Sequence, residues 1–169
     1  MKYATTYRSP IGTLTISSDG EAITGLWMEG QSYFAAGLSE NPLDGSQITV
    51  IQRTIAVLEN YFQGNGLNTS EICLRPQGTP FQRAVWDQLC QIPVGETKTY
   101  GQIAAFLEAS RGFKTSPRAV GNAVGRNPIS ILIPCHRIVG ADGRLTGYAG
   151  GIARKEFLLN LENRNGTTP

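Results

Sequence analysis

The pattern of apolar and polar positions predicts strands in the first part of the chain. Leu14 and Ile16 alternate with polar neighbours, and a second, less regular apolar stretch runs from Ala22 to Trp27. Alternation with a period of two is typical of a half-buried strand. Because Asp19-Gly20 lies between the two stretches and is a hairpin signal, we expect a tight turn to join the strands.

A helix is predicted after these strands. Its apolar residues recur at helical spacing, at Ile51, Ile55, Leu58 and Phe62. The Gly64-Asn65-Gly66 sequence ends this pattern, and residues 29–48 before it look loop-like. A short apolar strand is expected around Ile72–Leu74, so the first half is predicted to be a small α+β unit.

Capping residues predict three helices in the second half. The expected helices are Pro80–Cys90, Tyr100–Leu107 and Pro117–Arg126, with N-caps at Thr79, Thr99 and Ser116. A polar link, residues 108–115, separates the second helix from the third. The third helix is expected to expose Arg118, Gly121, Asn122 and Gly125. Such a helix pair is a DNA-binding arrangement, although many helix pairs serve only to pack a core.

Composition and charge narrow the possible classes of protein. With 169 residues, 40% of them hydrophobic, the chain can form one domain or two small ones, and 17% charged residues exclude a charge-rich disordered chain. Residues 1–75 carry 4 basic and 7 acidic residues, a net −3, whereas residues 76–169 carry 11 basic and 6 acidic residues, a net +5. We therefore expect an N-terminal support domain, 1–75, and a C-terminal domain, 76–169, that meets a polyanion, although local asymmetries of this size are common.

Membrane, disulfide and zinc chemistry are not expected. No apolar run approaches the roughly 18 residues of a membrane span, and the first ten residues lack the apolar stretch of a secretory signal, so a cytoplasmic protein is expected. The three cysteines, Cys73, Cys90 and Cys135, form no CxxC pair, and His136 is the single histidine. A metal site or a disulfide scaffold is therefore not predicted, and each cysteine is either chemically active or core filling.

One of the three cysteines stands in a distinctive setting. An apolar run, Ile129–Ile133, ends at Pro134, and Cys135 follows with His136 and Arg137 beside it. Proline restricts the residue before it to extended geometry, so we expect Cys135 at the end of a stiff strand or turn. A free thiol has a pKa of ~8.5, and an adjacent imidazole and a basic neighbour raise its thiolate fraction. The other two cysteines are expected to fill the core.

These residues resemble the O6-alkylguanine-DNA alkyltransferases, whose signature is Pro-Cys-His-Arg. The resemblance extends over nearly all of residues 78–162, in order. It is carried by Pro134-Cys-His-Arg137, Gly78-Thr-Pro-Phe-Gln, Trp86, Val94-Gly-Glu, Tyr100-Gly-Gln, Arg118-Ala-Val-Gly, Asn127-Pro, Gly147-Tyr-Ala-Gly-Gly151 and Lys155-Glu-Phe-Leu-Leu159. It implies an α+β fold, with a small strand-rich ribonuclease-H-like N-terminal domain and a mostly helical, winged helix-turn-helix-like domain after it.

The resemblance also implies a reaction. Cys135 would attack the alkyl carbon on O6 of guanine and keep the group as a stable thioether, so each molecule would act once and need no cofactor. His136 would be the base, acting through a bridging water because side chains of neighbouring extended residues diverge. Glu162 resembles the carboxylate that orients the histidine, and Asn127 resembles the residue that holds the turn.

Contacts to DNA follow from the same resemblance. The expected partner is duplex DNA containing O6-alkylguanine, with O4-alkylthymine as a second candidate, bound by a monomer whose clustering on DNA is left open. Arg118 would fill the space of the extruded base, Tyr100 would press on the 3′ phosphate, and Gly121, Asn122 and Gly125 would face the minor groove. The base pocket would include Tyr148, Ala149 and Gly150, and Lys155 would add charge near the phosphate path or the leaving oxygen.

The sequence departs from the family pattern at two places, and three other functions compete with DNA alkyl transfer. The link from Glu108 to Ser116 is longer than the usual family spacing, and its Arg111 and Lys114 either contact phosphates or remain free in solvent. The first half lacks the zinc ligands of some relatives. A non-catalytic alkyltransferase-like protein would have another residue in place of Cys135. A cysteine hydrolase would place its base far from the cysteine in sequence. A transcriptional regulator would leave the Pro-Cys-His-Arg turn unexplained.

Overall fold

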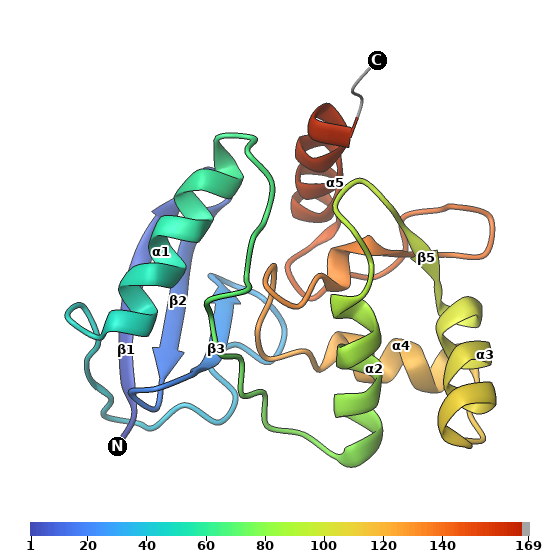
Figure 1. Ribbon diagram of the computed structural model, residues 1–169, viewed down its shortest axis with the longest axis horizontal. Coiled ribbons are helices and arrows are strands. Elements are labelled where there is room, and N and C mark those ends of the chain that lie inside the picture. The colour runs from blue at the N-terminus through green and yellow to red at the C-terminus, as the bar shows by residue number, and fades with distance from the viewer. Residues whose placement is uncertain (167–169) are drawn as a thin grey trace.

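The first half of the chain forms a four-stranded sheet with one helix packed on it (Figure 1). The computed structural model describes residues 1–166, with side chains through residue 164. The elements are β1 (Tyr3–Ser9), β2 (Gly12–Ser18), β3 (Ile23–Met28), β4 (Leu43–Asp44) and α1 (Thr49–Phe62). The sheet order is β3-β2-β1-β4, in which β1 runs antiparallel to β2 and parallel to β4, and β2 runs antiparallel to β3.

The expected hairpin is present between β2 and β3. The carboxylate of Asp19 accepts hydrogen bonds from the backbone N–H groups of Glu21 (3.0 Å) and Ala22 (2.9 Å). Such a turn is typical of aspartate, whose short side chain can bond the backbone two residues ahead. The alternating residues Leu14 and Ile16 are fully buried beneath α1, as their spacing predicts.

The second half is mainly helical. Its elements are α2 (Pro80–Cys90), β5 (Lys98–Thr99), α3 (Tyr100–Arg111), α4 (Pro117–Gly125), the short 3-10 turn η1 (Cys135–Arg137), β6 (Ile138–Val139) and α5 (Ile152–Gly166). The side chains of Thr79, Thr99 and Ser116 accept hydrogen bonds from backbone N–H groups at the starts of α2, α3 and α4, at 3.1–3.2 Å. All three predicted caps are therefore confirmed, and so is the α+β class.

The link between α3 and α4 is shorter than expected. The helix continues through Glu108 to Arg111 and ends at Gly112, whose φ of +67° suits a residue without a side chain. Only residues 112–116 form the link, and its Phe113 packs edge-on against Phe81 of α2. Arg111 faces Asp87 of α2 at 3.6 Å.

The two halves share a continuous hydrophobic core, joined along the outer edge of β3. Leu26 donates its backbone N–H to the carbonyl of Pro128 (2.9 Å) and accepts one from Ser130 (3.0 Å). The expected strand at 129–133 is therefore only a single bridge, because the chain turns away from β3 after residue 130. The segment around Cys73 bridges the start of the same strand and is likewise not a strand of its own. In the described part of the chain, no helix has the length and apolar character that crossing a membrane requires.

Candidate active site

The turn before the Pro-Cys-His-Arg sequence is held by hydrogen bonds of the Asn127 side chain and positions Cys135. The amide oxygen of Asn127 accepts a hydrogen bond from the N–H of Ile129 (3.0 Å), and its NH2 group donates to the carbonyl of Ile133 (2.8 Å). Between these two anchors Ile131 has a φ of +70°, a region that β-branched residues rarely adopt. One buried side chain thus spans the turn and holds a strained backbone in place.

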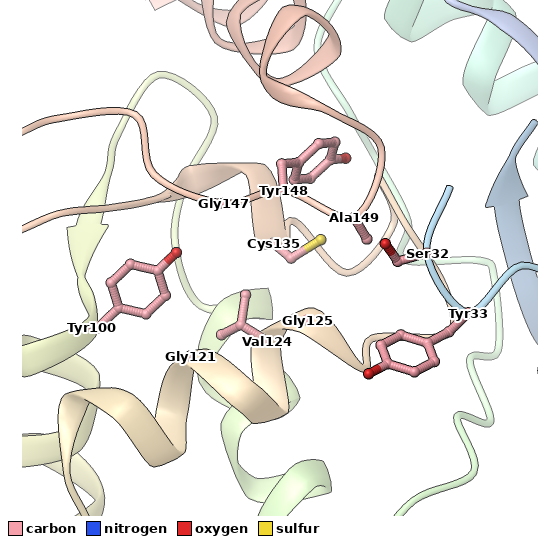
Figure 2. A pocket seen from close by; sticks show the side chains of 10 residues that line it. All are labelled: Ser32, Tyr33, Tyr100, Gly121, Val124, Gly125, Cys135, Gly147, Tyr148 and Ala149. Carbon is pink, nitrogen blue, oxygen red and sulfur yellow. The ribbon is translucent and has the colours of Figure 1, made fainter. Parts of the chain in front are cut away.

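Cys135 begins a 3-10 turn, so of the two expected settings, the end of a strand or a turn, the structure has the turn. Its side chain is only 4% exposed, yet its sulfur reaches a cavity of about 280 Å³. Figure 2 shows the sulfur between Tyr148 on one side and Val124 of α4 on the other. The thiol is therefore withdrawn from bulk solvent and still open to a molecule that enters the cavity.

Five parts of the chain form the walls of this cavity. They are the loop after β3, the start of α3, one side of α4, the turn η1 that begins with Cys135, and the segment before α5. The lining residues are Ser32, Tyr33, Tyr100, Gly121, Val124, Gly125, Cys135, Gly147, Tyr148 and Ala149. Ser32 donates its backbone N–H to the carbonyl of Ala149 (3.1 Å), and the guanidinium of Arg126 lies 4.0 Å over the ring of Tyr33. The sequence reasoning missed Ser32 and Tyr33, because residues 29–48 carry no periodic signal.

Behind the cysteine, a histidine and a carboxylate form a short buried pair. His136 Nε2 lies 2.6 Å from Glu162 Oε1, and both side chains are at most 1% exposed. An ionised carboxylate can only accept, so Nε2 carries the hydrogen and Nδ1 holds the free lone pair. Nδ1 is buried and has no hydrogen-bond partner among the described residues. The imidazole is thereby set up as a base whose open nitrogen is Nδ1.

Arg137 fixes the carboxylate from a second side. Its Nε donates to Glu162 Oε2 and its Nη2 to Oε1, both at 2.9 Å, while Nη1 donates to the carbonyl of Ile92 (2.6 Å). Burial alone would raise the pKa of Glu162, but the hydrogen bonds and charges of His136 and Arg137 lower it to about 2. Burial lowers the pKa of His136, against the opposing effect of Glu162. At neutral pH the pair is therefore a carboxylate and a neutral imidazole.

The thiol itself is not pre-ionised. Burial raises the pKa of Cys135, and the Asn127 side chain and the charge of Lys155 only partly oppose this. A thiol in such surroundings needs a nearby base before it can act as a nucleophile. His136, the next residue, carries a neutral imidazole whose Nδ1 has no hydrogen-bond partner among the described residues.

Comparison with known proteins identifies the family of this chain. The family model described as "6-O-methylguanine DNA methyltransferase, DNA binding domain" matches residues 80–164, and the model described as its "ribonuclease-like domain" matches residues 2–76. The chain belongs to this methyltransferase family. The strand-rich first half and helical second half that the resemblance implied are confirmed as the family's two parts.

Individual relatives cover nearly the whole chain. A "Methylated-DNA--protein-cysteine methyltransferase" of Haemophilus influenzae is 46% identical over 95% of this chain and 86% of the relative. A crystal structure of Mycobacterium tuberculosis O6-methylguanine methyltransferase superimposes with a TM-score of 0.82 at 40% identity, over 100% of this chain and 96% of the other. A structure of Mycobacterium tuberculosis OGT in complex with DNA gives the same TM-score and identity over 96% and 94% of the two chains.

Two positions were expected for Lys155 in this methyltransferase-family chain, near the phosphate path or near the leaving oxygen, and the structure contradicts the first. Its side chain is fully buried, so it does not lie on a surface path for phosphate. The ammonium group donates to the carbonyls of Thr146 (2.9 Å) and, more weakly, Gly147 (3.5 Å). Burial lowers the pKa of Lys155, and the charge of Cys135 raises it. Lys155 therefore holds the segment that carries Tyr148 and places a positive charge behind the thiol.

The other predicted pocket and surface residues divide into two groups. Tyr148 and Ala149 line the cavity, but Gly150 does not, since a Cβ there would lie 2.5 Å from Met28 Sδ, on the side of β3. On α4, Arg118 and Asn122 are exposed and point outward from the fold.

The two glycines of α4 lie between the cavity and the surface. Gly121 and Gly125 line the cavity, and a Cβ at Gly125 would meet open space. Tyr100 packs beside Gly121, 3.6 Å from where a Cβ would stand. The backbone of α4 is therefore accessible to a large ligand at both positions.

The two remaining cysteines were assigned wrongly to the core. Both Cys73 and Cys90 are exposed. Cys90 is the last residue of α2, where the helix leaves the core, and Cys73 uses its backbone carbonyl to bond the N–H of Ile23 (2.8 Å) while its side chain faces outward. Of the three thiols only Cys135 has both a base and a cavity.

Proposed function

We propose that this chain repairs DNA by moving the alkyl group of O6-alkylguanine in duplex DNA onto the sulfur of its own Cys135. The observation that carries the proposal is the thiol at the wall of the cavity, with a buried His136–Glu162 pair directly behind it. Relatives that share 40–46% of their residues with nearly the whole chain are named methylated-DNA–protein-cysteine methyltransferases. O4-alkylthymine is a second candidate substrate with the same chemistry.

The reaction begins with a proton transfer. The Cys135 thiol gives its proton, through a bridging water, to Nδ1 of His136, and Glu162 stabilises the imidazolium that forms. The thiolate then attacks the alkyl carbon, so that an S–C bond forms as the C–O6 bond breaks and the electron pair remains on the purine. The purine anion then takes up the proton that the His136 imidazolium gives back, so that guanine, the thioether and a neutral imidazole remain. Because a thioether is stable, each molecule reacts once.

The damaged base must leave the double helix to reach the sulfur. An O6 substituent lies inside the base stack, and enzymes that act on such atoms extrude the nucleotide into a pocket. The cavity opens beside α4, where Gly121 and Gly125 leave the backbone free for close approach to the minor groove. In this proposal the exposed Arg118 occupies the space that the base leaves in the stack, with Asn122 beside it, and Tyr100 presses on the 3′ phosphate. Tyr148 and Ala149 form the lip of the base pocket.

The proposal is tested by stoichiometry. The protein is incubated with duplex DNA carrying isotopically labelled O6-methylguanine, and the label is followed by intact mass and peptide mapping. We expect one methyl group per chain, on the peptide that contains Cys135, with intact guanine left in the DNA. Removal of more than one equivalent of methyl from the DNA per chain, or label on Cys73 or Cys90, contradicts the proposal.

The role of Arg118 gives a separate prediction. Arg118→Ala should slow repair of duplex O6-methylguanine by roughly tenfold to a hundredfold, because the extruded state loses the group that fills its gap. Reaction with free O6-benzylguanine should change less than about threefold, because no base has to leave a stack. Single-turnover rates with the two substrates measure the difference. Arg53→Ala, which removes an exposed arginine from α1, is the control, and an equal loss on both substrates for Arg118→Ala would refute the extrusion role.

The main competing function is damage recognition without chemistry. Such a protein would bind alkylated DNA and hold no nucleophile, whereas Cys135 here has a base and a cavity. The labelling experiment separates the two, because a recognition protein takes up no methyl group. We further propose that the protein acts in the cytoplasm as a monomer.

A further inference from the structure

A residue of the N-terminal half reaches the catalytic carboxylate. Tyr61, in the last turn of α1, is fully buried, and its hydroxyl donates a hydrogen bond of 2.8 Å to Glu162 Oε1. The two residues are 101 positions apart in the chain. Glu162 Oε1 thus accepts from three donors at once, namely Tyr61, His136 and Arg137.

This contact has a chemical consequence beyond packing. We propose that Tyr61 is a positioning residue of the reactive centre, whose hydroxyl competes for Glu162 Oε1 and so keeps the imidazole of His136 neutral and able to accept the proton of Cys135. The inference rests on the proposed function, since it assigns the N-terminal half a part in the same reaction. It deepens that function, because the sheet and α1 would otherwise serve only as support.

The direction of the effect follows from simple electrostatics. The positive end of the tyrosine O–H dipole points at Oε1, within one hydrogen-bond length of the oxygen that His136 also uses. Such a donor draws negative charge away from the His136 hydrogen bond and adds positive potential beside the ring. Both effects disfavour the imidazolium.

Arg137 already fixes the plane of the carboxylate through two of its nitrogens, so Glu162 keeps its orientation without the tyrosine. Loss of its hydroxyl should therefore change the electrostatics of the pair more than its geometry.

Other titratable and charged groups near His136, Glu162 and Tyr61 also affect the pKa values of these residues. They come from η1, α5 and the segment before α5, and are Cys135, Arg137, Lys155 and Tyr148. The positive charges of Arg137 and Lys155 lower the pKa of His136, as Tyr61 is argued to do. Desolvation and the neighbouring charge of Glu162 in turn raise the pKa of Tyr61, so the hydroxyl keeps its proton and remains a donor.

The test is Tyr61→Phe, which removes one oxygen and keeps the ring. Two quantities are measured: the pH at which the single-turnover methyl-transfer rate falls to half its plateau, and the proton resonance of His136 Nε2–H. Because the chain has a single histidine, that resonance needs no assignment among competitors. We expect the half-rate pH to rise by roughly half a unit to one unit, and the Nε2–H resonance to move downfield as its bond to Glu162 strengthens.

The controls make the outcome decisive. Thr54→Val removes another buried hydroxyl from α1, one that bonds the carbonyl of Val50 (2.8 Å), and should leave both readouts unchanged.

If Tyr61→Phe does not fold, 3-fluorotyrosine placed at position 61 is a stronger donor and should shift both readouts in the opposite direction. Unchanged readouts in Tyr61→Phe, or equal changes in Thr54→Val, would overturn the inference. If the wild-type protein transfers no methyl group, the proposed function fails. The Nε2–H resonance of His136 in wild type and Tyr61→Phe then still shows whether the Tyr61 hydroxyl weakens the His136–Glu162 hydrogen bond.

Discussion

Cys135→Ala is expected to bind duplex DNA carrying O6-methylguanine and to take up no methyl group. The substitution removes the nucleophile, while the exposed face of α4 and nine of the ten cavity-lining residues are untouched. Binding should stay within about threefold of the wild type, a change of less than 1 kcal/mol. The free energy of unfolding should fall by no more than about 1–2 kcal/mol, since one buried sulfur is lost.

Two measurements on the same sample check this prediction. Equilibrium binding to the modified duplex reports the interface, and intact mass after prolonged incubation reports methyl uptake. Cys73→Ala removes an exposed thiol instead and should react like the wild type. Residual methylation of Cys135→Ala at one equivalent per chain would mean that another side chain is the acceptor.

Local signals in the sequence predicted the helices and their beginnings. The caps at Thr79, Thr99 and Ser116 depend only on residues within one turn, so they could be read directly. The end of α3 was misplaced because its last turn, through Arg111, leaves the core and loses the apolar period while remaining helical. Periodicity reports burial, and a helix can continue where burial stops.

The conformation of the turn before Cys135, in contrast, could not be predicted from local sequence. The apolar run 129–133 has the composition of a strand, but its conformation is set by contacts that the run itself does not contain. Asn127 braces it from one side and the edge of β3 pairs with Ser130. These partners fix a φ of +70° at Ile131 that no local propensity would favour.

The chemistry of the site was more predictable than its supporting residues. Cys135 and His136 are adjacent and stand out in any reading of the chain, and the resemblance supplied Glu162. Tyr61 had no comparable signal, because it fits the apolar stripe of α1 and its partner lies 101 residues away. Lys155 and Glu162 do share a periodic signal with Leu158, since all three lie on the buried face of α5. That spacing could have placed Lys155 inside the protein rather than on its surface.

Glu162→Gln is expected to lower the methyl-transfer rate by about 10²–10³-fold and the free energy of unfolding by about 3–5 kcal/mol. The amide keeps the shape of the side chain but has one acceptor instead of two. If its oxygen takes the place of Oε1, its NH2 group faces Arg137 Nε, so two donors meet where one hydrogen bond stood. Arg137 then keeps a buried charge without its counter-charge, and the imidazolium that forms during reaction loses its stabilising partner.

Acid stability gives an independent signature of the same substitution. Because the folded-state pKa of Glu162 lies at about 2, below its ordinary value of 4.5, its ionisation stabilises the folded protein above pH 4.5. This contribution is lost as the pH falls from 4.5 towards 2, so the wild type should lose stability over that range, whereas Glu162→Gln should lose less. Denaturant unfolding at several pH values, with Glu156→Gln on the exposed face of α5 as the matched control, measures the difference. Parallel acid profiles of wild type and Glu162→Gln, together with an unchanged transfer rate, would show that the buried carboxylate neither stabilises the turn nor assists the base.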